Sequence, residues 1–378
     1  MANTLTALAP VLYSAARIVP REMTGILGAC QRNFDDKGVA KGDTVTVPIA
    51  PVLTKASVTP AQIFTIGSNR TAGSKVLTLN NYEEVKWHLT AEEDRSLQNA
   101  GVAQDMFKQT VEQGIRTLVN AIETSVWLKA RAGASRAVGT AATVPFGTNT
   151  DFLIDCKTIL DDNGASSADR SFIMNTAAAA KMMKIATLQK VNEAGSDGLL
   201  RQGLLGSLYG FDLRQSAAPV STTAGTGASY TSDTAGYAVG STAITLITGT
   251  GTILAGDVVT FTGDTNKYVV ATGVAAAGVL TLAEPGLKVA LAASAVALTV
   301  GAAATAHIAM HRNAVVAVVR PGLQPVGALA EQMVVTDPAT GLSFLMLRVV
   351  GDSVVSYYMR VVYDSFAPNS FACAQLLG

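Results

Sequence analysis

Two histidines, His307 and His311, stand four residues apart and are the first candidates for chemistry in this chain. On a helix, two imidazoles at this spacing share one face and can hold a zinc ion, with a glutamate beside the first histidine as general base. Ile308 stands in the place of that glutamate, and the valine-rich residues at 314–319 favour a strand. On a strand, positions i and i+4 are roughly 13 Å apart, too far for one ion. Since the third histidine, His88, lies in a distant segment, we interpret the pair as part of a strand and expect no metal site.

Other motifs that could do chemistry are incomplete. The stretch LDDNG at 160–164 resembles half of a calcium loop, but that loop would need an acid at position 159 and a glutamate at position 170, where Ile159 and Arg170 stand. We interpret it as a turn. The sequence has neither a glycine loop followed by Lys-Ser or Lys-Thr nor a serine elbow flanked by glycines. We therefore expect no enzyme activity, and assign no catalytic, cofactor-binding or metal-binding residue.

Composition restricts the partners. The 378 residues carry 28 basic and 28 acidic groups, so there is no cationic surplus for tight binding to nucleic acid phosphates. The three cysteines, Cys30, Cys156 and Cys373, are few and widely spaced, which favours reduced thiols in a cytoplasm. We expect neither a signal peptide at the start nor a membrane span in the uncharged stretch 289–306, which is mostly alanine and partly alternates like a strand.

The elements that must position these residues begin with one long helix. Thr90 and Glu93 form the pattern of a capping box. Apolar residues then recur at helical steps and predict a helix over 102–130, about 43 Å long. The stripe consists of Phe107, Val111, Ile115, Leu118, Ile122 and Val126. A partner-binding coiled coil would use such a stripe, but packing on the core of the same chain is the simpler interpretation.

Strand patterns lie on both sides of this helix. Before it, strand-like arms flank a polar tip at 67–74 and predict a long projecting hairpin. After it, only six of the 88 residues from 219 to 306 are charged, and short strand patterns recur about every ten residues. This change of composition predicts a small all-β module inserted into the chain.

Several stretches, taken in order, resemble the major capsid proteins of tailed bacteriophages, in particular the branch with an inserted β domain. RSFIMNTAAAAKMM is followed by GLLRQGLLGSLYGFDLRQSAAP before the insertion, and HRNA at 311–314 matches the element that resumes the core after it. The ending YDSFAPNSFACAQLL is similar to the last strand of that family. It departs from the family pattern at Asp364, in place of glycine, and at Ala367, in place of arginine.

The resemblance implies an α+β fold, the tailed-phage major capsid protein fold, with peripheral and axial domains. It implies an N-terminal arm at 1–40, an extended hairpin loop at 41–89, a spine helix at 90–133, a core at 134–218 and 307–378, and an inserted β-barrel-like domain at 219–306.

The implied function is a structural subunit of an icosahedral capsid that self-assembles around packaged double-stranded DNA. The implied partners are other copies of the chain in hexamers and pentamers, a scaffolding protein, a portal, and DNA contacted non-specifically. The implied place is the virion, after assembly in the host cytoplasm. The alternative is a β-rich binding module of a bacterial surface or a phage tail.

Mutational expectations follow from the sequence. We expect His307→Ala to leave assembly intact, and Arg312→Ala to lower soluble yield or particle formation because Arg312 would anchor the re-entering strand.

Overall fold

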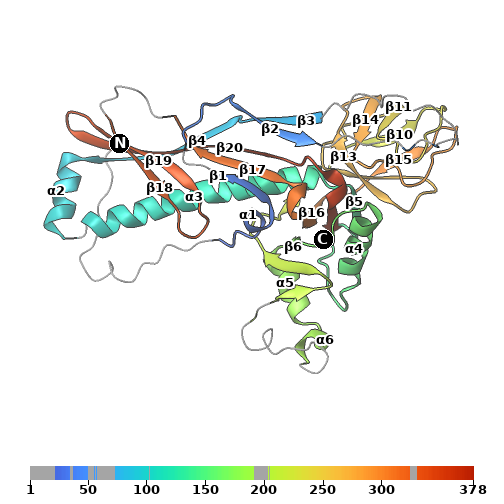
Figure 1. Ribbon diagram of the computed structural model, residues 1–378, viewed down its shortest axis with the longest axis horizontal. Coiled ribbons are helices and arrows are strands. Elements are labelled where there is room, and N and C mark those ends of the chain that lie inside the picture. The colour runs from blue at the N-terminus through green and yellow to red at the C-terminus, as the bar shows by residue number, and fades with distance from the viewer. Residues whose placement is uncertain are drawn as a thin grey trace.

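The computed structural model describes residues 22–34, 37–49, 55, 57, 73–101, 103–190, 203, 205–323 and 330–378. One long helix, α3 (Ala103–Ala132), lies along the long axis of the molecule and ends before a group of short strands at one end (Figure 1). A sheet lies over the helix, and α4 (Asp151–Asp162), α5 (Thr176–Met183) and α6 (Ala186–Gln189) extend from the half of the molecule that carries the short strands. The mixture of helices and sheets confirms the α+β class.

The helical region divides into two pieces. Thr90 caps α2 (Ala91–Asn99): its hydroxyl accepts from the N–H of Glu93 at 3.3 Å, and its own N–H donates to the Glu93 carboxylate at 3.0 Å. The predicted capping box is thus confirmed. Gly101, at φ +70°, separates α2 from α3 (Ala103–Ala132), which has 30 residues and is about 45 Å long.

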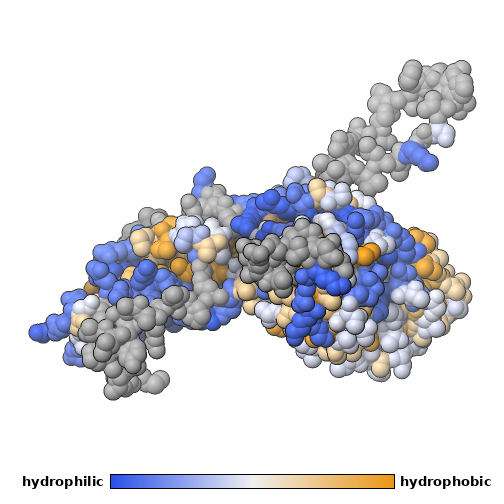
Figure 2. Space-filling model, turned by 90° about the horizontal axis from the view of Figure 1, so that it is seen from below, coloured by the Kyte–Doolittle hydropathy of each residue, from blue (hydrophilic) through white to orange (hydrophobic). Residues whose placement is uncertain are grey.

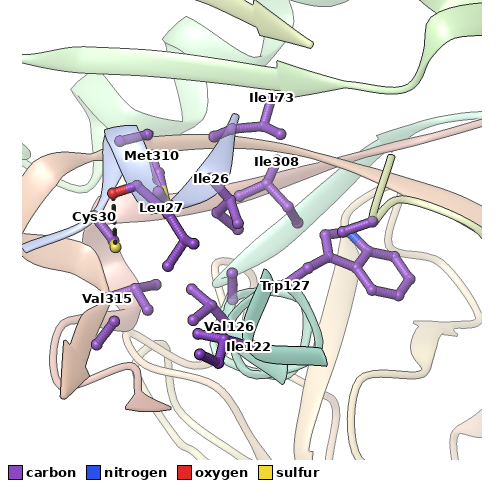
Figure 3. Packing of buried hydrophobic residues seen from close by; sticks show 14 of the residues in the cluster. Ile26, Leu27, Cys30, Ile122, Val126, Trp127, Ile173, Ile308, Met310 and Val315 are labelled. Atoms are coloured by element: carbon purple, nitrogen blue, oxygen red, sulfur yellow. Dashed lines mark hydrogen bonds between the residues drawn. The ribbon is translucent and has the colours of Figure 1, made fainter. Parts of the chain in front are cut away.

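The apolar stripe of α3 packs on the core of the same chain. From Ile115 to Val126 the stripe residues are buried. Figure 3 shows Ile122 and Val126 of α3 in one cluster with Leu27 of α1 (Ile26–Ala29) and Ile308 of β16 (Ala304–His311). The intramolecular interpretation of the stripe is therefore confirmed.

The first sheet has 6 strands and covers α3. Five strands follow the order β1 (Gln31–Phe34), β17 (Val316–Pro321), β20 (Val354–Phe366), β19 (Ser343–Val350), β18 (Ala330–Thr336). The sixth, β4 (Asn81–Thr90), pairs with β20 over its full length.

The described residues contain part of the predicted hairpin. β2 (Thr44–Ile49) and β3 (Gly73–Thr78) pair as antiparallel strands, in agreement with the predicted arms. The arm does not continue beyond Thr78, because β4 pairs with β20 instead. The tip, except for Gly73 and Ser74, lies outside the described residues.

Six antiparallel strands between residues 228 and 300 close into a ring, which we call the barrel. The strands are β10 (Ala228–Ser232), β11 (Ala243–Thr250), β12 (Val258–Phe261), β13 (Lys267–Thr272), β14 (Gly278–Leu282) and β15 (Ala297–Val300). The order is β12, β15, β10, β11, β14, β13, and a β12–β13 pairing closes the ring.

Alternation along the barrel strands fills the interior. Val259 and Phe261 are buried with Tyr230 and Leu280 in a cluster drawn from this segment alone, while Val258, next to Val259, belongs to the main core. In Figure 2 the end of the molecule that carries the barrel is largely pale and orange, in keeping with the scarcity of charge in 219–306.

The barrel continues into the second sheet of the molecule through β13, which pairs with β5 (Arg136–Gly139). Further strands follow in the order β21 (Cys373–Leu377), β16 (Ala304–His311), β6 (Arg170–Met174), β8 (Phe211–Gln215), β7 (Ser207–Leu208). Short β9 (Ser221–Thr222) pairs with the first residues of β16. The helices α4 (Asp151–Asp162), α5 (Thr176–Met183) and α6 (Ala186–Gln189) lie beside this sheet.

All three cysteines are free and buried. In the ranges given above, no helix combines the length and the apolar character needed to cross a membrane.

Candidate functional site

The histidine pair lies on a strand, as predicted. His307 and His311 both belong to β16, and His88 lies in β4 of the other sheet. His307 is 1% exposed, and its Nδ1 accepts from the N–H of Asn175 at 3.4 Å. Burial lowers the pKa of His307 to about 4. The Nδ1 of His311 accepts from the N–H of Asn313 at 3.1 Å and caps a short 3-10 helix. Among the described residues, no three His, Cys, Asp or Glu side chains gather where they could hold a metal ion.

The LDDNG stretch contains the end of α4 and the predicted turn that follows it. Gly164, at φ +75°, follows α4, and the N–H of Ala165 donates to the carbonyl of Leu160 at 3.0 Å, which is the Schellman pattern. Arg170 donates to Asp161 at 2.7 Å, and Asp162 accepts from Lys288 at 3.1 Å. These carboxylates therefore bind cationic side chains of the same chain.

The structure changes the reasoning behind the expectations for His307→Ala and Arg312→Ala. The ring of His307 is buried and accepts a hydrogen bond, so it is part of the core rather than a residue without a role. Arg312 lies exposed in the 3-10 helix Arg312–Ala314, and its N–H donates to the carbonyl of Asp169 at 3.2 Å. A strand pattern gives the alternation of faces but not which neighbouring strands cover them, so the burial of His307 was not evident from the sequence; the two expectations about assembly stay predictions.

Polar residues on one face of α3 bind the N-terminal segment. Arg116 forms an ion pair and short hydrogen bonds with Glu22, and the Asn120 amide donates to Glu22 at 2.7 Å. These two side chains lower the pKa of Glu22 to about 2. Arg116, Asn120 and Glu123 follow at helical steps of four and three, so they share one face of the helix.

Glu123, in the second half of α3, is a buried carboxylate, 2% exposed. It accepts from the N–H of Ile26 at 2.8 Å, from the N–H of Leu27 at 3.1 Å and from the hydroxyl of Ser216 at 2.7 Å. The backbone of Gly25 also acts to lower the pKa of this carboxyl group. Burial raises the pKa of Glu123, and these donors oppose that shift. The carboxylate thus joins α1, α3 and the end of β8.

A second buried charge fixes the barrel to the core. Asp257, 2% exposed, accepts from the N–H of Gly225 at 2.9 Å and from the N–H of Leu254 at 2.8 Å. Its other carboxylate oxygen lies 3.6 Å from the guanidinium of Arg131, at the end of α3. Lys267 donates to the carbonyl of Gly139 in β5. The barrel is therefore held by strand pairing, an ion pair and a lysine contact together.

Sequence reasoning missed Glu123 and Asp257 as organising residues. The only signal for Glu123 was a charge next to Ile122 in a predicted buried stripe, and for Asp257 a charge in a segment that has few. Buried carboxylates need hydrogen-bond donors, so each of these positions could have been examined for a tertiary role.

Comparison with known proteins identifies the fold. No family model matches the chain, and no curated protein matches it. A chain in the capsid structure of cyanophage P-SCSP1u is similar with a TM-score of 0.54 at 11% identity, over 100% of this chain and 95% of that one. A chain of Mycobacterium phage Che8 gives 0.53 at 11% identity, over 99% and 98%. A chain of Gordonia phage Cozz gives 0.50 at 12% identity, over 98% and 92%. The chain therefore has, over nearly its whole length, the fold of bacteriophage proteins that include a chain of a phage capsid.

Proposed function

We propose that this protein is the structural subunit of an icosahedral bacteriophage capsid, a major capsid protein of the tailed-phage type, which self-assembles into the shell around packaged double-stranded DNA. The observation that carries the proposal is the likeness to the cyanophage capsid chain over 100% of this chain. The alternative, a β-rich binding module of a bacterial surface or phage tail, has no comparable support.

The proposal also assigns each segment of the chain to a part of the subunit. We assign an N-terminal arm to 1–40, an extended loop to 41–89, the spine helix to 90–133 and the peripheral and axial core to 134–218 and 307–378. The separate β2–β3 sheet supports the loop, and the closed strand ring with its own buried cluster supports an inserted domain at 219–306.

The partners that follow are other copies of the chain in hexamers and pentamers, a scaffolding protein and a portal, with assembly in the host cytoplasm and residence in the virion. Many modest contacts repeated around a closed shell give high overall stability, which suits an elongated subunit with projecting parts. The balance of 28 basic and 28 acidic groups supports only non-specific contact with DNA. The role is structural rather than enzymatic.

Electron microscopy of the purified protein, with and without a co-expressed scaffolding protein, tests the proposal. We expect closed particles of megadalton mass, and size-exclusion chromatography with light scattering measures that mass in solution. A protein that stays monomeric in every assembly condition would contradict the proposed function.

A further inference from the structure

The Glu123 carboxylate lies where three segments that are distant in sequence meet. α1 contributes the N–H groups of Ile26 and Leu27, α3 contributes Glu123, and the residue after β8 contributes the Ser216 hydroxyl. The partners are separated from Glu123 by 97, 96 and 93 residues. One side chain therefore fixes the relative position of three parts of the fold.

The N-terminal segment also touches the end of β8 directly. The N–H of Ala217 donates to the carbonyl of Met23 at 3.0 Å. A Cβ at Gly25 would lie 2.4 Å from the carbonyl oxygen of Gln215, so the two backbones are already as close as glycine allows. β9 (Ser221–Thr222) begins soon after Ser216 and leads into the barrel. A shift at this point would thus displace the chain that leads through β9 to β10, the first strand of the barrel.

The donors around Glu123 depend on one another. A buried carboxylate stays in place only while hydrogen-bond donors replace the water that it has lost. Hydrogen bonds to a buried charge are among the strongest in a protein. If one donor is removed, the carboxylate loses such a bond, and we expect it and its remaining partners to rearrange. The Ser216 hydroxyl and the N–H groups of α1 therefore share one acceptor rather than acting separately.

We propose that Glu123 is a positioning residue that couples the N-terminal segment of the subunit to the strand end that leads into the barrel. A displacement of either element, for example when a neighbouring molecule binds it, is transmitted to the other through this carboxylate. The coupling belongs to the subunit itself, so it stands or falls independently of shell formation.

Amide hydrogen exchange on the soluble full-length chain tests the coupling. Ser216→Ala removes the hydroxyl that follows β8, and we expect exchange of the Ile26 and Leu27 amides to become about tenfold faster. Ser135→Ala is the matched control: its hydroxyl is equally buried and donates to the carbonyl of Cys373 at 2.8 Å, away from Glu123. The control should leave the Ile26 and Leu27 amides unchanged. Equal exchange at these amides in both variants would overturn the proposal.

A double-mutant cycle separates coupling from general loosening. Glu123→Met removes both carboxylate oxygens but keeps a side chain of similar length, and we expect it to speed exchange at Ile26 and Leu27 by itself. In the Glu123→Met background, Ser216→Ala should add less than threefold, because the shared acceptor is already lost. Full additivity of the two effects would show that Ser216 acts on α1 by another route, against the proposal. Each variant is compared at equal folded fraction, measured by circular dichroism.

Discussion

At the scale of single residues, His307 makes the stability of the protein depend on pH. Burial lowers its pKa from 6.5 to about 4, so the folded state takes up the proton less readily than the unfolded chain. The stability from this residue is complete above about pH 6.5 and is lost as the pH falls through about 4. We expect the free energy of unfolding to fall by about 2 kcal/mol between pH 7 and pH 5 from this residue alone.

Urea unfolding of wild type and two variants at both pH values measures this contribution. His307→Gln should flatten the pH dependence, because glutamine has no titrating group. His88→Gln is the matched control, since His88 is exposed on β4, and it should keep the wild-type slope. A His307→Gln protein with the wild-type slope would show that another group titrates in this range.

His307 and Arg312 also differ in their value to the fold. His307→Ala removes a buried ring and leaves the N–H of Asn175 without its acceptor, so we expect a loss of about 2 kcal/mol or more in the free energy of unfolding. Arg312→Ala changes an exposed side chain, and we expect less than about 0.5 kcal/mol. Chemical denaturation compares the two, and a larger loss in Arg312→Ala would restore the ranking that the sequence suggested.

At the scale of elements, replacing one glycine of α3 by alanine should stabilise the protein. A Cβ at Gly114 would make ordinary contacts, 3.6 Å from the Met359 side chain and 3.7 Å from Val85. Gly114→Ala should therefore raise the free energy of unfolding by about 1 kcal/mol, because alanine favours the helix and restricts the unfolded chain. Gly133→Ala is the contrast, since its Cβ would lie 2.2 Å from the Cβ of Ala367, and it should destabilise. Thermal melts of both variants test this prediction. A lowered midpoint for Gly114→Ala would show that the new Cβ clashes with Met359 or Val85.

The barrel should fold when it is separated from the rest of the chain. Its ring of strands closes on itself and its buried cluster is drawn from its own residues. A fragment of residues 219–306 is longer than the roughly 40 residues below which disulfides or metals are usually needed. We expect a β-type circular dichroism spectrum and one cooperative thermal transition, at a lower midpoint than in the full chain because Val258 and Asp257 lose the core and Arg131. A random-coil spectrum would show that the ring forms only on the core.

Local patterns in the sequence predicted local elements well. The capping box at Thr90, the stripe of α3 and the turn after α4 each depend on residues within a few positions of one another. The pairing of β4 with β20 joins Asn81 to Tyr363, and no periodicity encodes such a partner. Glu123 was missed for the same reason, since its donors lie more than 90 residues away.

At the scale of the whole molecule, we expect the predicted hairpin to act between copies of the chain rather than within one. The sequence predicted a polar tip at 67–74, of which Gly73 and Ser74 pair with Ile49 and Pro48 in the β2–β3 ladder. A deletion of 67–72 spares that ladder, so we expect a folded monomer with an unchanged melting temperature that forms few particles. Light scattering and electron microscopy measure assembly, and normal shells from the deleted protein would show that the tip is dispensable.

The two ends of the barrel segment are neighbours. Ser221 and Thr222 of β9 pair with Thr305 and Ala304 of β16, so the chain leaves the core and returns to it at adjacent points of one ladder. A segment attached in this way can be replaced. Another folded domain whose own termini lie close together can stand in its place without changing the path of the chain through the core. If the proposed shell forms, each particle would then be a scaffold for displaying many copies of a chosen protein at fixed spacing.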